Sequence, residues 1–137
     1  MVRAWARLLR AQRVALSKVE TELKSADLPA LVWYDVLLEV ERSGAAGIRP
    51  FELERAMLLT QYNLSRLLER IEDAGYIERH ACPDDGRGHT IHITDRGKKL
   101  RRTMWPVYGR AIESAVGAHL SQREAETLAE ILGRLGG

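Results

Sequence analysis

Six side chains that can donate hydrogen bonds lie close together near the middle of the chain. They occur in the segment QYNLSRLLER and are Gln61, Tyr62, Asn63, Ser65, Arg66 and Arg70. Amide, hydroxyl and guanidinium donors form hydrogen bonds with phosphate oxygens and with the edges of nucleic-acid bases. The first acidic residue of this segment is Glu69, so nothing in its leading half repels a polyanion.

The same segment has the apolar spacing of a helix that docks one face on a core. Its apolar residues recur at i, i+3, i+4 and i+7 and are Leu64, Leu67, Leu68 and Ile71. At about 100° per residue they share one face, and the polar donors and two late acids, Glu69 and Asp73, lie around the other. Thr60 is predicted to be the N-cap of a helix over 61–74, and Gly75 to be the left-handed residue that ends it.

A turn with an arginine near its tip follows, in the sequence PDDGRGHTIHIT at 83–94. The run TIHIT alternates as a half-buried strand does, and YIERHAC before the turn is its predicted partner strand. Arg87 and His89 on such a turn are predicted to contact a phosphate or a narrow minor groove. Asp85 is predicted to brace Arg87 through a charge-assisted pair.

The rest of the chain is predicted to form the helices that position these two segments. Short breaks separate helices expected at 3–24, from Pro29 to Gly44, from Pro50 to Met57, at 95–118 after the cap Thr94, and after the Ser121/Glu124 capping box. The apolar stripe of the last helix is most simply a packing face. The order predicts a mainly α chain with a small β-hairpin wing: a winged helix-turn-helix with long helices at both ends.

Composition sets limits on the class of protein. The 137 residues fit one domain, and with 45% hydrophobic and 29% charged residues the chain is neither disordered nor membrane-spanning. Because net charge is only +2, local basic clusters matter more than the total: six Lys or Arg in 1–24, and five between Arg96 and Arg102. On charge alone, these clusters are better explained as solvated helix faces. The single cysteine, Cys82, excludes an internal disulfide, and we expect a cytoplasmic protein.

The combination of these segments resembles the MarR (multiple antibiotic resistance regulator) family of transcription regulators. The family's wing motif is D-x-R followed by a strand and L-T-x-x-G. Here it is Asp85, Arg87, Ile93, Thr94 and Gly97, with isoleucine in place of the usual leucine. The upstream stretch LPALVWYDVLLEVE also resembles the family's second helix, so the resemblance covers nearly the whole chain.

The resemblance implies a homodimeric repressor that binds a pseudo-palindromic operator in double-stranded DNA. It implies one MarR-like domain over 1–137, with a winged helix-turn-helix core at about 29–97 and dimerisation helices at about 1–25 and 98–137. The residues assigned to DNA binding are Gln61, Tyr62, Asn63, Ser65, Arg66, Arg70, Arg87 and His89. Release by a small aromatic or phenolic ligand is implied too, and the candidate ligand residues are Trp33, Tyr34, Trp5 and Trp105. Aromatic residues at helical positions are more often core than pocket.

Two other functions stay open at this point. A redox-sensing regulator would use Cys82, although a small inert residue is the simpler interpretation. A winged-helix module that binds protein instead of DNA would carry apolar residues at the leading end of the helix, where only Tyr62 is of that kind. We expect no enzyme, metal or cofactor, because the histidines at 80, 89 and 92 do not have structural zinc spacing and no catalytic motif is present.

Overall fold

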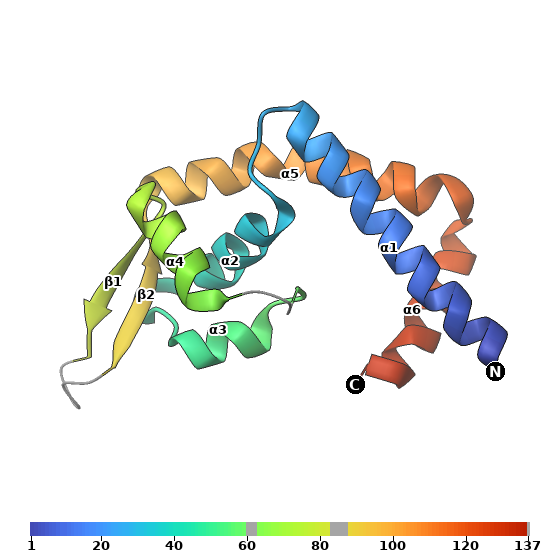
Figure 1. Ribbon diagram of the computed structural model, residues 1–137, viewed down its shortest axis with the longest axis horizontal. Coiled ribbons are helices and arrows are strands. Elements are labelled where there is room, and N and C mark those ends of the chain that lie inside the picture. The colour runs from blue at the N-terminus through green and yellow to red at the C-terminus, as the bar shows by residue number, and fades with distance from the viewer. Residues whose placement is uncertain (60–62, 83–87, 137) are drawn as a thin grey trace. The chain divides into compact units, whose positions relative to one another are not determined.

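The computed structural model describes residues 1–59, 63–82 and 88–136, and Figure 1 shows their arrangement. Within these residues the elements are α1 (Val2–Ser25), α2 (Leu31–Arg42), a 3₁₀ turn (Gly44–Ala46), α3 (Pro50–Ala56), α4 (Leu64–Asp73), β1 (Ile77–Ala81), β2 (His89–Ile93), α5 (Asp95–Ala115), a second 3₁₀ turn (Gly117–His119) and α6 (Gln122–Gly136). The predicted fold class, helices with one antiparallel hairpin, is confirmed. None of the described helices is both long and apolar enough to cross a membrane.

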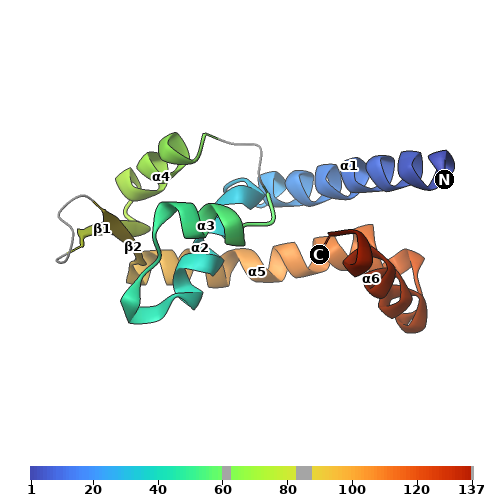
Figure 2. The same cartoon turned by 90° about the horizontal axis from the view of Figure 1, so that it is seen from below.

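The chain forms two compact units. One is Pro29–Trp105, called here the core unit, and the other combines Met1–Leu28 with Pro106–Gly137 and is called the terminal unit. Helix α5 contributes its first half to the core unit and its second half to the terminal unit. Figures 1 and 2 both show α2, α3 and α4 grouped with the hairpin.

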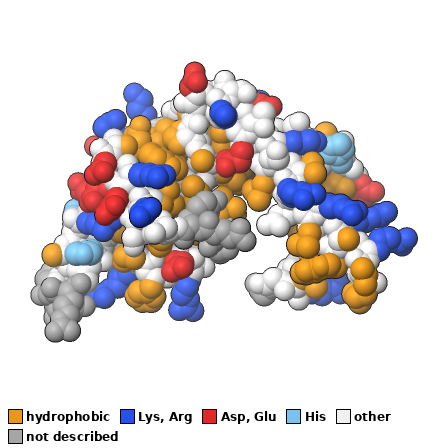
Figure 3. All heavy atoms as spheres, in the orientation of Figure 1, with side chains coloured by type: hydrophobic (Ala, Val, Ile, Leu, Met, Phe, Trp, Pro, Cys, Tyr) orange, Lys and Arg blue, Asp and Glu red, His pale blue; other side chains and the backbone are white. Residues whose placement is uncertain are grey.

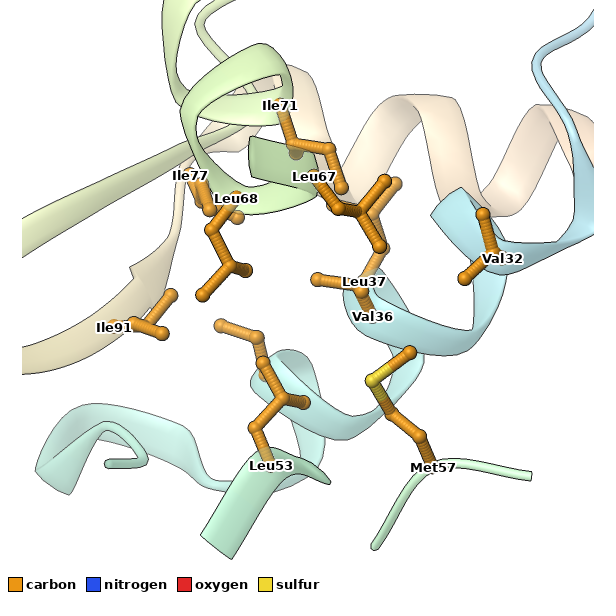
Figure 4. Packing of buried hydrophobic residues seen from close by; sticks show 11 residues of the cluster. Val32, Val36, Leu37, Leu53, Met57, Leu67, Leu68, Ile71, Ile77 and Ile91 are labelled. Carbon is orange, nitrogen blue, oxygen red and sulfur yellow. The ribbon is translucent and has the colours of Figure 1, made fainter. Parts of the chain in front are cut away.

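Apolar side chains from α2, α3, α4, β1 and β2 meet in one cluster (Figure 4), and Leu100 of α5 packs against it. Leu53 of α3, Ile71 of α4 and Ile91 of β2 have no exposed surface at all. Burying a side chain of this size contributes about 1.5–3 kcal/mol, so the cluster fixes how α4 lies on the domain. The predicted apolar face of α4 is confirmed, because Leu67 and Leu68 are also buried.

Strand β2 has a neighbour on each side. It pairs antiparallel with β1, in the register Ile77 with Ile93 and Ala81 with His89. On its other edge Ile91 exchanges two backbone hydrogen bonds with Ile48, at 2.8 and 3.1 Å. The hairpin is therefore fastened to the segment between α2 and α3.

The turn from α4 into β1 confirms the prediction for Gly75. This glycine has a φ of 85°, and its N–H donates to Glu72 O at 2.8 Å. The N–H of Tyr76 donates to Ile71 O at 3.1 Å, which completes a Schellman end. Because the left-handed conformation favours glycine, this residue decides where α4 stops.

The predicted cap of α5 is confirmed as well. Thr94 Oγ1 accepts a hydrogen bond from Gly97 N–H at 3.1 Å and donates one to Gly75 O at 2.7 Å. A single hydroxyl thus caps α5 and ties it to the end of α4.

Outside α4, the predicted start of α2 and the predicted end of α5 were wrong. Helix α2 begins at Leu31 after the extended N-cap Ala30, so Pro29 precedes the helix and does not lie in its first turn. Burial of Leu31, which is 5% exposed, sets this start. Helix α5 ends at Ala115 and not at 118, because the next turn contains Gly117 and is 3₁₀.

In the terminal unit, α6 begins with the predicted capping box. Ser121 N–H donates to Glu124 Oε2 at 2.8 Å, and Glu124 N–H donates back to Ser121 Oγ at 3.2 Å. Val19 and Leu23 of α1 are buried, whereas α6 contains no buried residue among those described. The apolar stripe predicted on α6 is therefore left without a complete cover.

Candidate nucleic-acid interface

Helix α4 begins three residues later than predicted. Its N-cap is Asn63, whose backbone is extended and whose side-chain Oδ1 accepts a hydrogen bond from Arg66 N–H at 3.2 Å. The prediction of Thr60 as the cap and of a helix from residue 61 was wrong. Both residues are cap formers, and asparagine is the stronger of the two. Asn63 was also predicted to lie on the helix face, and it instead starts the helix.

Asn63→Ala is expected to lower the free energy of unfolding by about 1 kcal/mol, the usual cost of losing a side-chain N-cap. Urea unfolding measures this change, and Asn63→Ser, which keeps an acceptor oxygen, is the matched control. If the alanine and serine variants unfold at the same urea concentration, the cap has no energetic role.

The exposed face of α4 carries charged and polar side chains. Three of the predicted DNA-binding residues are exposed on this face: Ser65, Arg66 and Arg70. The acidic residues Glu69 and Asp73 are exposed as well. Arg66 makes no ion pair with another described residue. Its guanidinium is thus available in the first turn of α4, where the helix dipole also favours a negative partner.

Part of the predicted interface falls outside the described residues. Gln61, Tyr62, Asp85 and Arg87 lie there, so the bracing of Arg87 by Asp85 stays a prediction. His89 is described, and its exposed side chain lies at the first position of β2.

Asp35, a buried carboxylate behind this interface, was not predicted from the sequence. Asp35 lies on α2, is 5% exposed, and its Oδ2 accepts a hydrogen bond from Leu59 N–H at 2.9 Å. It therefore ties α2 to the segment that leads from α3 to α4. Burial raises the pKa of Asp35 and the charge of Glu39 adds to the rise, while backbone hydrogen bonds from Leu59 and Leu58 oppose it. A lone acid in the apolar run LVWYDVLLEV was the signal that could have revealed it.

Asp35→Asn is expected to make the protein more stable near neutral pH. The folded-state pKa of Asp35 is raised above its unfolded value of about 3.9, so folding stability falls as pH rises from there through the folded pKa. Asparagine keeps an acceptor oxygen but carries no charge, so the variant should avoid this loss, and its advantage should shrink toward pH of about 4. Urea unfolding across this pH range tests the difference. A variant less stable than the parent near neutral pH would mean that the hydrogen bonds to the carboxylate outweigh its burial.

The three candidate ligand residues of the core unit lie in two separate ring pairs. Tyr34 is buried and stacks with Trp105, with ring centroids 6.2 Å apart and planes at 27°. Trp33 packs against the core and lies edge-on to Tyr76 at 6.0 Å. Trp5 is 62% exposed and belongs to the terminal unit. A ligand role for these residues stays a prediction.

At least two members of the basic cluster at 96–102 are used for packing. Arg101 of α5 forms an ion pair with Glu41 of α2. Burial lowers the pKa of Arg101, but hydrogen bonds and charge interactions with Glu41 and Tyr34 outweigh burial and raise it. Arg96 lies over the ring of Tyr76, 5.1 Å from its centroid. These two arginines join α5 to its neighbours within the core unit.

Neither the redox nor the metal interpretation gains a site here. Cys82 is 7% exposed, and its backbone N–H donates to Gly88 O at 3.0 Å. Buried thiols of this kind are structural more often than reactive. In the part of the chain that the structure describes, no three His, Cys, Asp or Glu side chains gather in a way that could hold a metal ion.

Comparison with known proteins shows which family this fold resembles. The family model described as MarR family matches residues 26–88, which include α2, α3, α4 and β1. Over these residues the chain is similar to the MarR family. The resemblance inferred from the wing motif is thereby confirmed.

Two curated regulators have sequences similar to this chain. It is 28% identical over 88 residues to the multiple antibiotic resistance protein MarR of Escherichia coli, across 64% of this chain. It is also 28% identical over 103 residues to the HTH-type transcriptional regulator PecS of Dickeya dadantii, across 74% of this chain. Each alignment spans only 61% of the relative's own length.

Solved structures of MarR-family proteins match nearly the whole fold. Sco3205 of Streptomyces coelicolor, a MarR family transcriptional regulator in complex with DNA, superposes with a TM-score of 0.86 and 26% identity. The match covers 96% of this chain and 83% of that one. Wild-type MarR of Escherichia coli in its apo form gives a TM-score of 0.75 at 24% identity, with 96% of each chain covered.

Proposed function

We propose that this chain is a MarR-family transcription regulator that binds a palindromic operator in double-stranded DNA, most simply as a repressor. The observation that carries the proposal is the exposed donor face of α4, on a helix whose opposite face is buried in the core unit. A helix with an apolar back and donors in its first turns fits the major groove. This role requires no catalytic residue or cofactor.

The names of the relatives support the same function. PecS is named as a transcriptional regulator. The transcriptional repressor MprA of Escherichia coli is 27% identical to this chain over 72% of its length. The Sco3205 structure contains DNA. A protein-interaction module is the weaker alternative, because the exposed side chains of α4 within its described residues are polar or charged.

The proposal includes a homodimer, with a second copy covering the terminal unit. A groove of about 1060 Å³ runs between α1, the end of α5 and α6, and its walls are almost entirely apolar. Trp5 is 62% exposed there and Leu135 is 71% exposed. Figure 3 shows apolar side chains gathered over α6. Apolar surface of this extent usually marks a protein interface.

Selection of bound sequences from a random DNA duplex pool tests DNA binding and symmetry together. We expect two inverted half-sites about one helical turn apart or more. Affinity for the selected duplex should fall steeply as salt rises, because bound phosphates release counterions. Recovery of no preferred sequence, or binding independent of salt, would contradict the proposal.

Sedimentation equilibrium at micromolar concentration tests the dimer. The parent is expected to sediment as two copies, and Leu132→Asp, which places a charge in the apolar groove, is expected to shift it toward one copy. The control is Glu130→Asp, which keeps the charge of a side chain that does not line the groove. A parent that is monomeric under these conditions would exclude this part of the proposal.

A further inference from the structure

Two histidines stack on the face of the hairpin opposite the core. His80 of β1 and His92 of β2 have ring centroids 4.1 Å apart and planes at 22°. Register places His80 across from Thr90, and Glu78 across from His92. Neither ring belongs to the residues assigned to DNA binding, so the pair has no role in the function proposed so far.

Each ring also has a polar partner on its own strand. His80 Nε2 lies 3.0 Å from Glu78 Oε1, and His92 Nε2 lies 2.8 Å from Thr90 Oγ1. Both rings are therefore held in one orientation, and the stack does not depend on their contact alone.

The ring of His92 also packs on the segment that borders β2. Gly47 has a φ of 71°, and a Cβ added there would lie 2.5 Å from the ring of His92. The next residue, Ile48, forms the two backbone hydrogen bonds with Ile91. The position of one imidazole therefore affects three backbone segments at the base of the hairpin: β1, β2 and 47–48.

We propose that the His80–His92 pair is a proton-sensitive clasp, which holds the base of the hairpin when at most one ring is protonated and loosens it when both are. The regulatory part of this proposal rests on the proposed function, because a loosened hairpin matters for DNA binding by the wing. The structural part, a coupled titration that moves the hairpin, stands without DNA.

The charges around the pair can balance one proton but not two. Glu78 is the only acid that contacts it among the described residues, and it lies against His80. The bordering segment 44–48 has the sequence GAAGI and contains no titratable side chain. Helices α2 and α3 reach β2 through the apolar side of Ile91, where Arg79 also lies by register. A second imidazolium would therefore meet a like charge with no further acid to offset it.

The direction of the pH effect follows from the surroundings of His92. Burial lowers the pKa of His92, the charge of His80 lowers it further, and Glu78 partly opposes both. Its folded-state pKa thus lies below the unfolded value of about 6.5. The contribution of the clasp is complete above about pH 6.5 and is lost as pH falls through the lowered pKa.

The same geometry argues against a metal site. The ring planes are almost parallel, so the in-plane lone pairs of their nitrogens run side by side and do not converge on one point. A shared metal ion needs nitrogens of both rings at about 2.0–2.1 Å. The arrangement of the two rings therefore suits the binding of protons and not the coordination of a shared metal ion.

A histidine ring titration by NMR on the full chain, without DNA, tests the clasp itself. We expect His92 to titrate below about 6.5, the value of an unfolded histidine, and the amide signals of 47–48 to shift with it. In His80→Phe, which keeps a stacked ring but no charge, the midpoint of His92 should rise. An unchanged midpoint in this variant, or amides of 47–48 that do not respond, would overturn the proposal.

Binding of the selected duplex at constant ionic strength tests the regulation. Between about pH 7.5 and 5.5 the parent is expected to lose about twofold to fivefold more affinity than His92→Phe, the range that adjacent like charges across a strand pair produce. Glu130→Asp, which changes no histidine and no residue lining the groove, is the control and should follow the parent. Identical curves for the parent and His92→Phe, or an affinity that rises on acidification, would overturn the regulatory part. If neither the parent nor any variant binds a duplex at any pH, the proposed function is refuted instead. The NMR test of the clasp is made without DNA and does not depend on that outcome.

Discussion

Replacing Gly97 with alanine is expected to lower the free energy of unfolding by about 3 kcal/mol, near the upper end for overpacked sites. A Cβ at this position would lie 2.1 Å from the backbone oxygen of Tyr76 and 2.8 Å from Ile93 Cγ1. The oxygen cannot move away cheaply, because it accepts a hydrogen bond from Thr94 N–H at 3.1 Å. The clash therefore separates α5 from the end of α4, and both the cap and the hairpin lose their support.

Urea unfolding of Gly97→Ala measures this loss, and Gly133→Ala in α6 is the matched control. Both glycines lie in helices, but a Cβ at Gly133 would meet no atom within 4 Å. The control should be unchanged or more stable by up to about 1 kcal/mol, because alanine favours a helix over glycine. If the two variants unfold at similar urea concentrations, close packing is not the reason for glycine at position 97.

Gly97 also illustrates what the sequence could and could not predict about the fold. The spacing of Thr94 and Gly97 predicted the start of α5 and the family, because capping depends on residues that are neighbours in sequence. The close approach of the Tyr76 oxygen could not be predicted in the same way. It depends on how the α4–β1 turn docks on α5, which is a property of packing between elements.

The start of α4 was mispredicted for a related reason. Thr60 and Asn63 are both suitable N-caps, and the stronger propensity of asparagine is too small to decide the start of the helix from sequence alone. In the folded chain Leu67, Leu68 and Ile71 are buried, and Asn63 makes the cap hydrogen bond. Tertiary contacts thus set the limit of the helix within a segment whose helical character was evident from its apolar spacing.

Asp35 and Arg79, two residues whose contacts were not predicted from the sequence, join different elements of the core unit. Asp35 accepts its hydrogen bond from Leu59, and Arg79 lies with its Nε 3.5 Å from a Glu72 oxygen at the back of α4. A lone acid in an apolar run could have drawn attention to Asp35, but nothing in the sequence indicated its partner. The exposed donors of α4 were easier to predict, since a period of 3.6 residues identifies the face opposite an apolar stripe.

In the terminal unit, one chain alone does not cover its own apolar surface. The stripe on α6 was predicted from its spacing, and in the structure Ile131 remains 42% exposed and Leu128 39% exposed. Periodicity predicts which face is apolar but not what covers it. A second copy is the cover that the proposed dimer supplies.

Arg66→Ala is expected to weaken binding to the selected duplex by about 1–3 kcal/mol if its guanidinium contacts a base edge. The variant should also relax the preference at one position in each half-site. Folding should change little, because the contact of Arg66 within the protein is its backbone N–H to Asn63, and alanine keeps that group. The measurement is affinity for the selected duplex and for duplexes changed at single positions.

Two comparisons separate base recognition from simple charge. Arg134→Ala in α6 removes one exposed positive charge from the terminal unit and should leave the sequence preference intact. Arg87→Ala, outside the described residues, is expected to weaken binding to all duplexes more evenly, because phosphate and groove contacts position a protein without specifying sequence. If Arg66→Ala keeps the parent's preference at every position, α4 does not supply the sequence choice. The selectivity would then have to come from the wing, and the assignment of α4 as the recognition helix would be lost while DNA binding itself survived.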